Sequence, residues 1–364
     1  MKWKFYSLAF VAGMSILTAC SSDDNNDNDG NGGIGNGNEI ENGTILKGTI
    51  TSDVTLAAGN TYKLSGEYIV EEGATLHIEE GVKIIAVYDD IADYILVKQG
   101  GKINAVGTPD KPIVMTSEKE EPGAWGGIHI CGRAHTNAEG GKGSSEIGGA
   151  VYGGNDDADN SGTLQYIRLE YTGFAFDEEH EANGISFYGV GNGTIVDHCQ
   201  AYKGSDDGFE FFGGSVNVSN LVAVSCSDDS FDWTEGWNGK GTNLVAYQEA
   251  ESTLGYDCDC LMECDNNGSN NAATPVAHPV LKNLILVGNG GSKQGIRLRA
   301  GTEVEIDNAK VCGKGQPLTV ETALTENALK NGTSKLTNIT LTSELSCNCL
   351  LYTSDAADDT PCVD

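Results

Sequence analysis

The feature that most constrains this chain is a set of short apolar segments that recur along its second half. The segments read TLQYIRLEY, TIVDHCQAY, VSNLVAVS, TNLVAYQ, LKNLILVG and VEIDNAKV. Aligning them on Leu164, Ile195, Leu221, Leu244, Leu284 and Ile306 gives steps of roughly 22 to 40 residues. Strand-forming residues in alternation, separated by Gly-rich turns, predict a β-solenoid and argue against helical repeats.

A second set of segments follows the same interval. It reads GISFYG, GFEFFG, SFDWTE, CLMECD and GIRLRA. Parallel stacking of both sets predicts an all-β fold, a right-handed parallel β-helix, whose coils lie about 4.8 Å apart. Glycines are expected at the corners, where left-handed backbone is needed. The residues expected to face the core are Ile185, Phe187, Phe209, Phe211, Phe231, Trp233, Ile296 and Leu298.

The N-terminal residues 1–19 have the form of a lipoprotein signal peptide. Lys2 and Lys4 precede an apolar run, and the small residues before Cys20 resemble a bacterial lipobox, which predicts lipidation of Cys20. Residues 20–43 are polar and acidic and predict a disordered tether. Acidic residues close behind Cys20 resemble the surface-export signal of Bacteroidota lipoproteins. We therefore expect an outer-membrane lipoprotein that faces outside the cell and meets the membrane through its lipid anchor only.

The C-terminal residues 349–364 do not share the repeat pattern. Read back into codons, CLLYTSDAADD matches the transposase adapter of a common sequencing library, and the final CVD matches the next fixed part of that adapter. We expect residues 349–364 to be adapter read-through, which leaves 44–348 as the β-helix domain. The cysteines between Cys131 and Cys347 are expected either to form disulfides, as in exported proteins, or to pack as buried thiols.

Five stretches carry a family resemblance: EEGATLHIEEGVKI, GGKINAVGTPDKPIVMTS, WGGIHICGRA, DDGFEFFGG and FDWTEG. They resemble a family of secreted Bacteroidota β-helix lipoproteins in the pectate-lyase-like superfamily, and the resemblance runs from about Thr44 to Asn348. It implies the fold and the compartment, and almost nothing about a reaction.

Paired aspartates mark two of the repeats, in GSDDGFEFFGG and CSDDSFDWTEG. Parallel stacking places one pair above the other and aligns an outward row of Glu210, Asp232 and Glu263 that ends at Arg297. Two carboxylates about 4.8 Å apart repel by roughly 3–4 kcal/mol at an effective dielectric near 20. Such a column needs cations, arginines or hydrogen bonds to offset the repulsion. The stacked carboxylates are Asp206, Asp207, Glu210, Asp228, Asp229 and Asp232.

Three interpretations of these carboxylates remain open. In the first, the aspartates accept hydrogen bonds from backbone amides at the corners, as Asp does in turns. In the second, the six carboxylates bind Ca²⁺, a hard cation that prefers oxygen ligands. In the third, they form a catalytic site for an acidic polysaccharide, since β-helix lyases use Ca²⁺ with an Arg base and β-helix hydrolases use clustered aspartates. No residue is assigned a catalytic role.

Two classes of function follow. We favour a surface protein whose β-helix binds or adheres to carbohydrate, such as a polysaccharide or surface glycan. The alternative is a polysaccharide lyase or glycoside hydrolase that acts on acidic glycans. The formal charge of −31 argues against nucleic acid as a partner. The candidate ligand-binding residues are Phe212 and Trp237, as stacking platforms for sugar rings, with Glu263, Arg297 and Arg299.

Overall fold

The computed structural model describes residues 39–89, 91–176 and 180–344. The predicted signal peptide, Cys20 and residues 349–364 lie outside the described residues. The predicted tether was too long at its C-terminal end. Glu39–Ile40 already forms a strand that pairs with Val54–Leu56, and Ile40 packs against the core. The β-helix therefore begins at Glu39 among the described residues.

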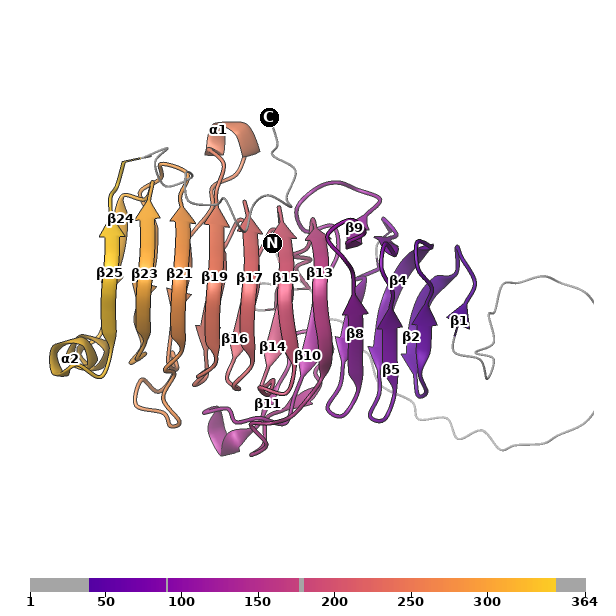
Figure 1. The fold of residues 1–364 in the computed structure, drawn as a ribbon, viewed down its shortest axis with the longest axis horizontal. Helices are drawn as coiled ribbons and strands as arrows, with labels where there is room; N and C mark the ends of the chain where they lie inside the picture. The colour runs from indigo at the N-terminus through magenta and orange to yellow at the C-terminus, as the bar shows by residue number, and fades with distance from the viewer. Residues whose placement is uncertain (1–38, 90, 177–179, 345–364) are drawn as a thin grey trace, which may run out of the picture. The chain divides into compact units, whose positions relative to one another are not determined.

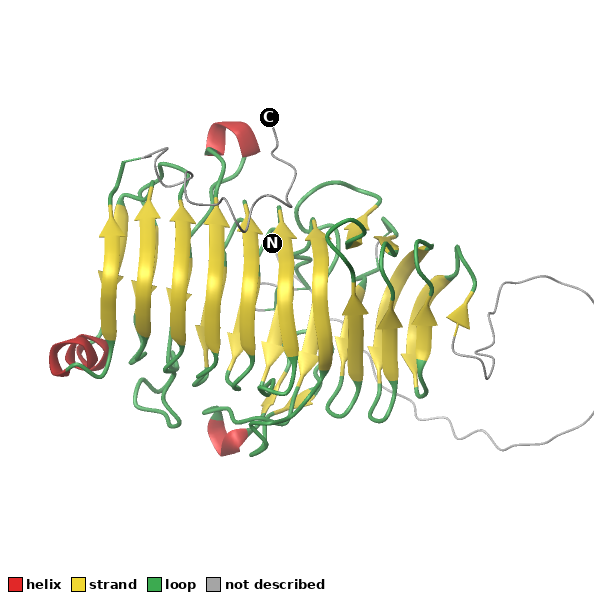
Figure 2. Ribbon diagram, in the orientation of Figure 1, coloured by secondary structure: helices red, strands yellow, loops and turns green. Residues whose placement is uncertain are grey.

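Strands make up almost all of the regular structure (Figures 1 and 2). The first strands are β1 Glu39–Ile40, β2 Ile45–Ile50, β3 Val54–Leu56, β4 Thr61–Val70, β5 Thr75–Ile78, β6 Lys83–Ala86, β7 Tyr94–Val97, β8 Lys102–Val106, β9 Ile113–Ser117, β10 Ile128–Cys131, β11 Gly143–Ser144 and β12 Val151–Tyr152. The later strands are β13 Gly162–Glu170, β14 Ile185–Tyr188, β15 Ile195–Tyr202, β16 Phe209–Phe212, β17 Asn217–Val224, β18 Phe231–Thr234, β19 Lys240–Tyr247, β20 Met262–Cys264, β21 Val280–Val287, β22 Gln294–Leu298, β23 Glu305–Cys312, β24 Gln316–Val320 and β25 Lys335–Leu341. The helices are a 3₁₀ turn Glu139–Gly141, α1 Glu251–Leu254 and α2 Ala323–Asn331.

The strands pair in parallel from coil to coil. Short strands β7, β10, β14, β16, β18, β20, β22 and β24 form one column, and long strands β13, β15, β17, β19, β21, β23 and β25 form another (Figure 1). The small β11–β12 hairpin is antiparallel and separate from this sheet. Parallel crossovers between strands of one sheet are right-handed. The predicted right-handed parallel β-helix is confirmed.

The expected core residues all face inward. Phe209 pairs in register with Phe231, and Phe211 pairs with Trp233, and all four side chains are buried in one continuous apolar cluster. The rings of Phe209 and Phe231 stack with centroids 5.6 Å apart. Parallel pairing places residues of like character above one another, so β20 and β22 continue this stack with aliphatic and sulfur-containing side chains.

One corner of the coil is turned by asparagines, which the prediction of glycine corners did not include. Asn220, Asn243, Asn283 and Asn308 lie in the middle of successive long strands with φ between 54° and 63°. From Asn243 onward, each carboxamide donates to the one in the coil before it, at 2.8, 3.0 and 2.9 Å along the ladder. Asparagine tolerates left-handed backbone better than most residues and bonds locally, so it bends these long strands there. In β13 and β15 the same position is held by Tyr166 and His198, with φ of 52° and 51°.

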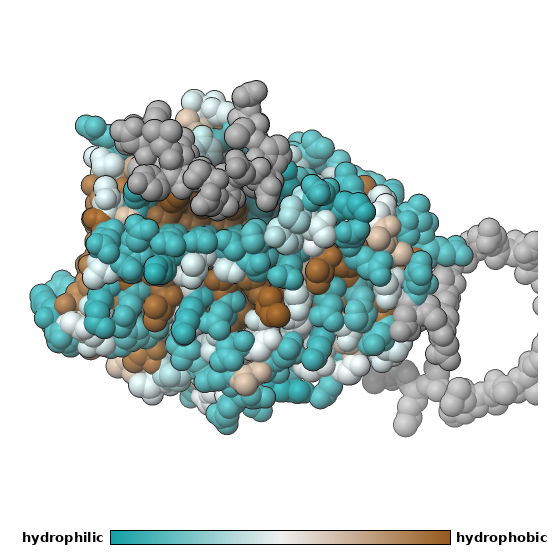
Figure 3. Space-filling model, in the orientation of Figure 1, coloured by the Kyte–Doolittle hydropathy of each residue, from teal (hydrophilic) through white to brown (hydrophobic). Residues whose placement is uncertain are grey.

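The alignment of the long strands from sequence was partly wrong. Leu164 pairs with Val196, whereas Ile195 points outward and is 52% exposed. Leu221 and Leu244 are in register with each other but belong to the segment after the bend. The mid-strand bend reverses the alternation, so two rows of inward residues were merged into one. On the face shown in Figure 3, such exposed apolar residues are scattered among hydrophilic ones.

A second, smaller apolar cluster lies outside the coil. Residues 132–161, between β10 and β13, carry the β11–β12 hairpin, and Ile147 and Tyr152 from this segment pack on Tyr188 and Phe212. This covering segment turns outward-facing positions of the short strands into buried ones. The cluster comprises Tyr94, Leu96, Cys131, Ile147, Ala150, Tyr152, Ala182, Tyr188 and Phe212.

Most cysteines of the described residues are buried thiols rather than disulfides. These are Cys131, Cys199, Cys226, Cys258, Cys260 and Cys264. Burial raises the pKa of Cys199 and Cys226 to about 12, as expected for thiols that pack as small apolar groups. Within the described residues, no helix is long and apolar enough to cross a membrane.

Candidate functional site

The outward carboxylate row predicted from sequence has the expected register. Ser186 pairs with Glu210, Glu210 with Asp232, Asp232 with Glu263, and Glu263 with Arg297. These side chains alternate with the buried core residues of β14, β16, β18, β20 and β22. The alternation of the strands therefore stacks three acidic side chains directly above one another.

The second aspartate of each pair supports the corner. Asp207 Oδ1 accepts a hydrogen bond from the backbone N–H of Asp229 at 2.8 Å, and Asp229 Oδ1 accepts one from the N–H of Cys260 at 2.6 Å. In the coil before them, Asn183 Oδ1 accepts a hydrogen bond from the backbone N–H of Asp207 at 3.2 Å. The turn interpretation is therefore confirmed for Asp207 and Asp229, each of which binds the corner of the next coil.

The first aspartate of each pair lines a small acidic cavity of about 190 Å³, and Asp207 lines it as well. Asp206 lies in the turn before β16 and Asp228 in the turn before β18, while Glu210 and Asp232 reach the cavity from those strands. The complete lining consists of Glu146, Glu181, Asp206, Asp207, Glu210, Asp228 and Asp232. We call this space the acidic cavity.

Two members of this lining were missed from sequence. Glu146 comes from the covering segment, between β11 and β12, and Glu181 comes from the loop before β14. Neither lies on a repeat, so the repeat pattern could not place them. Only the folding of the covering segment onto the short strands brings Glu146 to the cavity.

Burial and mutual repulsion raise the pKa of several of these carboxyls, which favours their protonated form. Burial, with the neighbouring charge of Asp228, raises the pKa of Asp206 to about 8. Burial also raises the pKa of Asp207, Glu210 and Asp232 well above the usual range, and further carboxylates of the cluster add to each shift. Asp232 Oδ1 is buried and has no hydrogen-bond partner among the described residues. The folded chain thus brings together carboxyls that no Lys or Arg neutralises among the described ion pairs.

The row ends differently on its C-terminal side, where arginines neutralise it. Arg297 Nη1 lies 2.9 Å from Glu263, and Arg299 contacts Glu263 and also Asp265, the latter at 2.7 Å. Arg297 makes a second ion pair with Glu321 at 3.0 Å. The three residues Glu263, Arg297 and Arg299, predicted to bind ligand, are therefore brought together, but their charges are paired with one another and with Asp265 and Glu321.

The two aromatic residues predicted to stack on sugar rings are buried, so that prediction is wrong. Phe212 is 7% exposed and its ring stacks on Tyr188, with centroids 4.4 Å apart, beneath the covering segment. Trp237 is 1% exposed and stacks on Phe211 inside the coil, at 4.2 Å. A sugar ring cannot reach either face. Neither burial follows from local sequence, because distant segments supply the cover.

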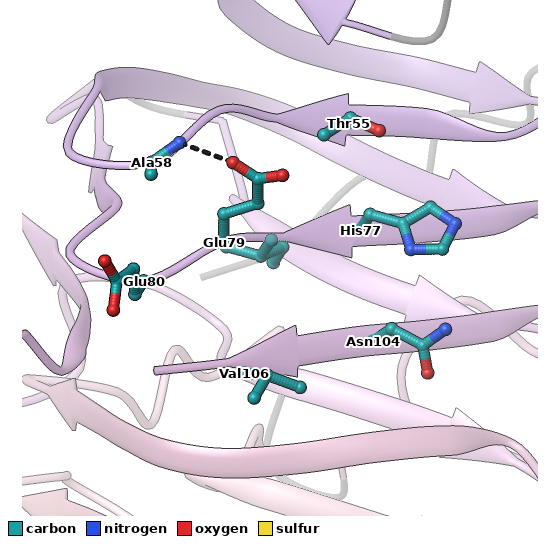
Figure 4. Close-up of a pocket in the computed structure, with 8 residues that line it drawn as sticks. Thr55, Ala58, His77, Glu79, Glu80, Asn104 and Val106 are labelled. Atoms are coloured by element: carbon teal, nitrogen blue, oxygen red, sulfur yellow. Dashed lines mark hydrogen bonds between the residues drawn. The ribbon is translucent and has the colours of Figure 1, made fainter. Parts of the chain in front are cut away.

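A second hollow lies on the N-terminal coils (Figure 4). It has a volume of about 550 Å³, and His77 and Asn104 project beside it from neighbouring strands. Its acidic groups have partners: Glu79 accepts from the N–H of Ala58 at 2.9 Å, and Glu80 pairs with Lys111 at 2.8 Å. This hollow therefore lacks the unsatisfied charge of the acidic cavity.

Comparison with known families and proteins gives one match. The model of a family described as a pectate-lyase-like β-helix domain matches residues 48–360. No curated protein and no solved structure matches the chain. The family match agrees with the observed coil and with the superfamily that the sequence motifs resemble.

Proposed function

This chain belongs to the family of pectate-lyase-like β-helix domains, and we propose that it binds anionic carbohydrate through Ca²⁺ held in the acidic cavity. The family points to a carbohydrate-related function. The observation that carries the proposal is the set of carboxylates in the cavity, which have no Lys or Arg partner among the described ion pairs.

The donor set suits Ca²⁺. Asp206, Asp207 and Asp228 each offer one carboxylate oxygen within 4.8 Å of the others, and so do Asp207, Glu210 and Asp232. Ca²⁺ takes six to eight oxygen ligands at about 2.3–2.6 Å, and carboxylates are its preferred protein ligands. An ion there would offset the repulsion that raises the pKa of these carboxyls. It would supply positive charge and open coordination positions.

The ligand class follows from charge. A formal charge of −31 repels an acidic glycan, so a positive site is needed to hold one. Asp228 and Glu181 line the cavity and are exposed, which gives the bound ion a route to solvent and to a carboxylate of the glycan. A neutral glycan lacks that charged ligand and is expected to bind more weakly.

A glycan array probed with and without Ca²⁺ tests this function. We expect binding to uronate-containing or sulfated glycans in Ca²⁺ and its loss after chelation. Asp206→Asn combined with Asp228→Asn should abolish binding, while Asp110→Asn, at an exposed turn residue outside the cavity, should not. Equal binding in Ca²⁺ and in chelator would contradict the proposal.

The enzymatic alternative is supported by one observation, the raised pKa of two cavity carboxyls. Asp206, with its pKa raised to about 8, and Glu146, with its pKa raised to about 7, retain protons at neutral pH and suit a general acid. The ion pairs of Arg297 and Arg299 weigh against the Arg base of a lyase. Assaying the array-positive glycans for new reducing ends or unsaturated products distinguishes catalysis from binding.

The proposed location is the outer face of the outer membrane, with the lipid on Cys20 as the only membrane contact. The lipobox, the acidic tether and the Bacteroidota resemblance support this location. A β-helix on a tether would meet glycans outside the cell.

A further inference from the structure

We propose that the acidic cavity holds two cations bridged by Asp207, an inference that rests on the proposed Ca²⁺ site. The two groups of ligand atoms overlap at that one residue. The outer group is Asp206, Asp207 and Asp228, and the inner group is Asp207, Glu210 and Asp232.

The spacing of each group suits one ion. The ligand atoms within each group lie within 4.8 Å of one another. Two oxygens on opposite sides of one Ca²⁺ are separated by about 4.6–5.2 Å, twice the usual Ca–O distance. Each group can therefore close around its own ion. A carboxylate has two oxygens, so Asp207 can contribute to both.

The cavity offers enough charge and space for two ions. Seven carboxyl side chains line it, and its volume is about 190 Å³. A single Ca²⁺ would leave most of their charge uncompensated if they ionised. A water molecule occupies about 30 Å³ in the liquid, so two ions and several waters fit.

The neighbouring group shares Asp232 with the inner group, but arginines neutralise its last member, Glu263. Asp229, Asp232 and Glu263 also have ligand atoms within 4.8 Å of one another. There Glu263 pairs with Arg297 and Arg299, so the protein supplies its own cations. The described ion pairs include no such arginine for the inner or the outer group.

An independent observation points to the inner ion. Asp232 Oδ1 is buried and has no hydrogen-bond partner among the described residues, although Asp232 lines the cavity. Its neighbours are held in place: Asn183 Nδ2 donates to Glu210 Oε2 at 2.5 Å, and Asp207 Oδ1 accepts from the N–H of Asp229. An unsatisfied buried carboxylate oxygen is costly, and a cation would satisfy it. This oxygen is not part of the outer group.

Counting bound Ca²⁺ tests the inference. The mature chain is stripped of metal, equilibrated with Ca²⁺ alone by dialysis, and analysed for calcium per protein. We expect two ions in the parent and two in Asp110→Asn. Asp206→Asn with Asp228→Asn should retain one ion, as should Glu210→Gln with Asp232→Asn. Asp207→Asn should lose both, while its amide oxygen can still accept the N–H of Asp229.

The outcomes separate this inference from the proposed function. One ion in the parent overturns the bridged pair and leaves Ca²⁺-dependent glycan binding intact. No ion overturns both. If a double variant fails to fold, the count on the parent still decides. Two ions in the parent that both survive Asp207→Asn would overturn the bridging role of that residue.

Discussion

The two adjacent aspartates of each pair have different roles, although they are the same residue type. Asp207 and Asp229 accept backbone amides of the next coil, whereas Asp206 and Asp228 line the acidic cavity, which Asp207 also lines. The pair therefore combines turn chemistry and a candidate ion site in two residues.

The cavity predicts an unusual pH dependence for the ion-free protein. Burial holds the pKa of Asp206 near 8, above the value of about 4 in an unfolded chain. At this carboxyl the folded state binds more protons than the unfolded state, so its contribution to the free energy of unfolding is most favourable below pH 4 and falls as the pH rises toward 8. One pKa unit corresponds to about 1.4 kcal/mol, so the fall should reach at least that size.

Thermal melts of ion-depleted protein between pH 4 and 8 measure this fall. Saturating Ca²⁺ should reverse it near neutral pH, since the ion binds the ionised carboxylates and only the folded state holds the site. Asp206→Asn with Asp228→Asn should flatten the profile of the ion-free protein. If the parent and this double variant have the same profile in the absence of metal, the electrostatic picture of the cavity is wrong.

At the scale of elements, the long strands depend on their asparagine ladder. Asn243 donates to Asn220, accepts from Asn283, and has a φ of 58°. The bend at this position lets each long strand serve two sides of the coil. The same carboxamide–carboxamide hydrogen bond joins each pair of successive long strands from β17 to β23.

Asn243→Ala is expected to destabilise the fold by about 1–3 kcal/mol. It removes two side-chain hydrogen bonds. It also leaves alanine, whose side chain cannot hydrogen-bond, in a left-handed backbone conformation that its Cβ disfavours. Asn243→Gly removes the same bonds but tolerates the backbone, so it should cost less. Urea unfolding of the three proteins gives both differences. Equal stability of the Ala variant and the parent would show that the ladder is dispensable.

At the scale of the whole molecule, a repetitive coil carries a non-repetitive cover. The core runs through the coils, while the covering segment closes over part of the short-strand column and supplies Glu146 to the cavity. Stability thus comes from the repeats, and the candidate site forms where the cover meets them. The lipid anchor proposed at Cys20 would place this assembly outside the cell.

The anchor predicts membrane partition of the full chain in a bacterial host that processes lipoproteins. Cys20→Ser removes the thiol to which lipid is attached, so the variant should leave the membrane fraction or accumulate unprocessed. Cys131→Ser, at a cysteine buried under the covering segment, serves as the control and should not change fractionation. Release of the parent protein from the membrane fraction without detergent would argue against lipidation.

The sequence by itself determined the coil and the order of its stacked side chains. Period-2 alternation and a steady repeat are local signals, and parallel pairing converts them directly into register. Phe211 therefore lies against Trp233, and Glu210 against Asp232, as predicted. The bend in each long strand was less visible, because one residue at left-handed φ reverses the alternation, and that residue is Tyr166 or His198 in β13 and β15 and an asparagine in later strands.

The tertiary structure alone decided which outward residues meet solvent. Phe212 occupies an outward position that the covering segment buries, and Trp237 is buried against Phe211. Glu146 joins Asp206 only because the segment between β10 and β13 folds back. Such contacts join residues that no repeat relates, and burial depends on every segment that packs nearby. The sequence therefore determined which carboxylates stack, and the fold determined which of them lack a partner.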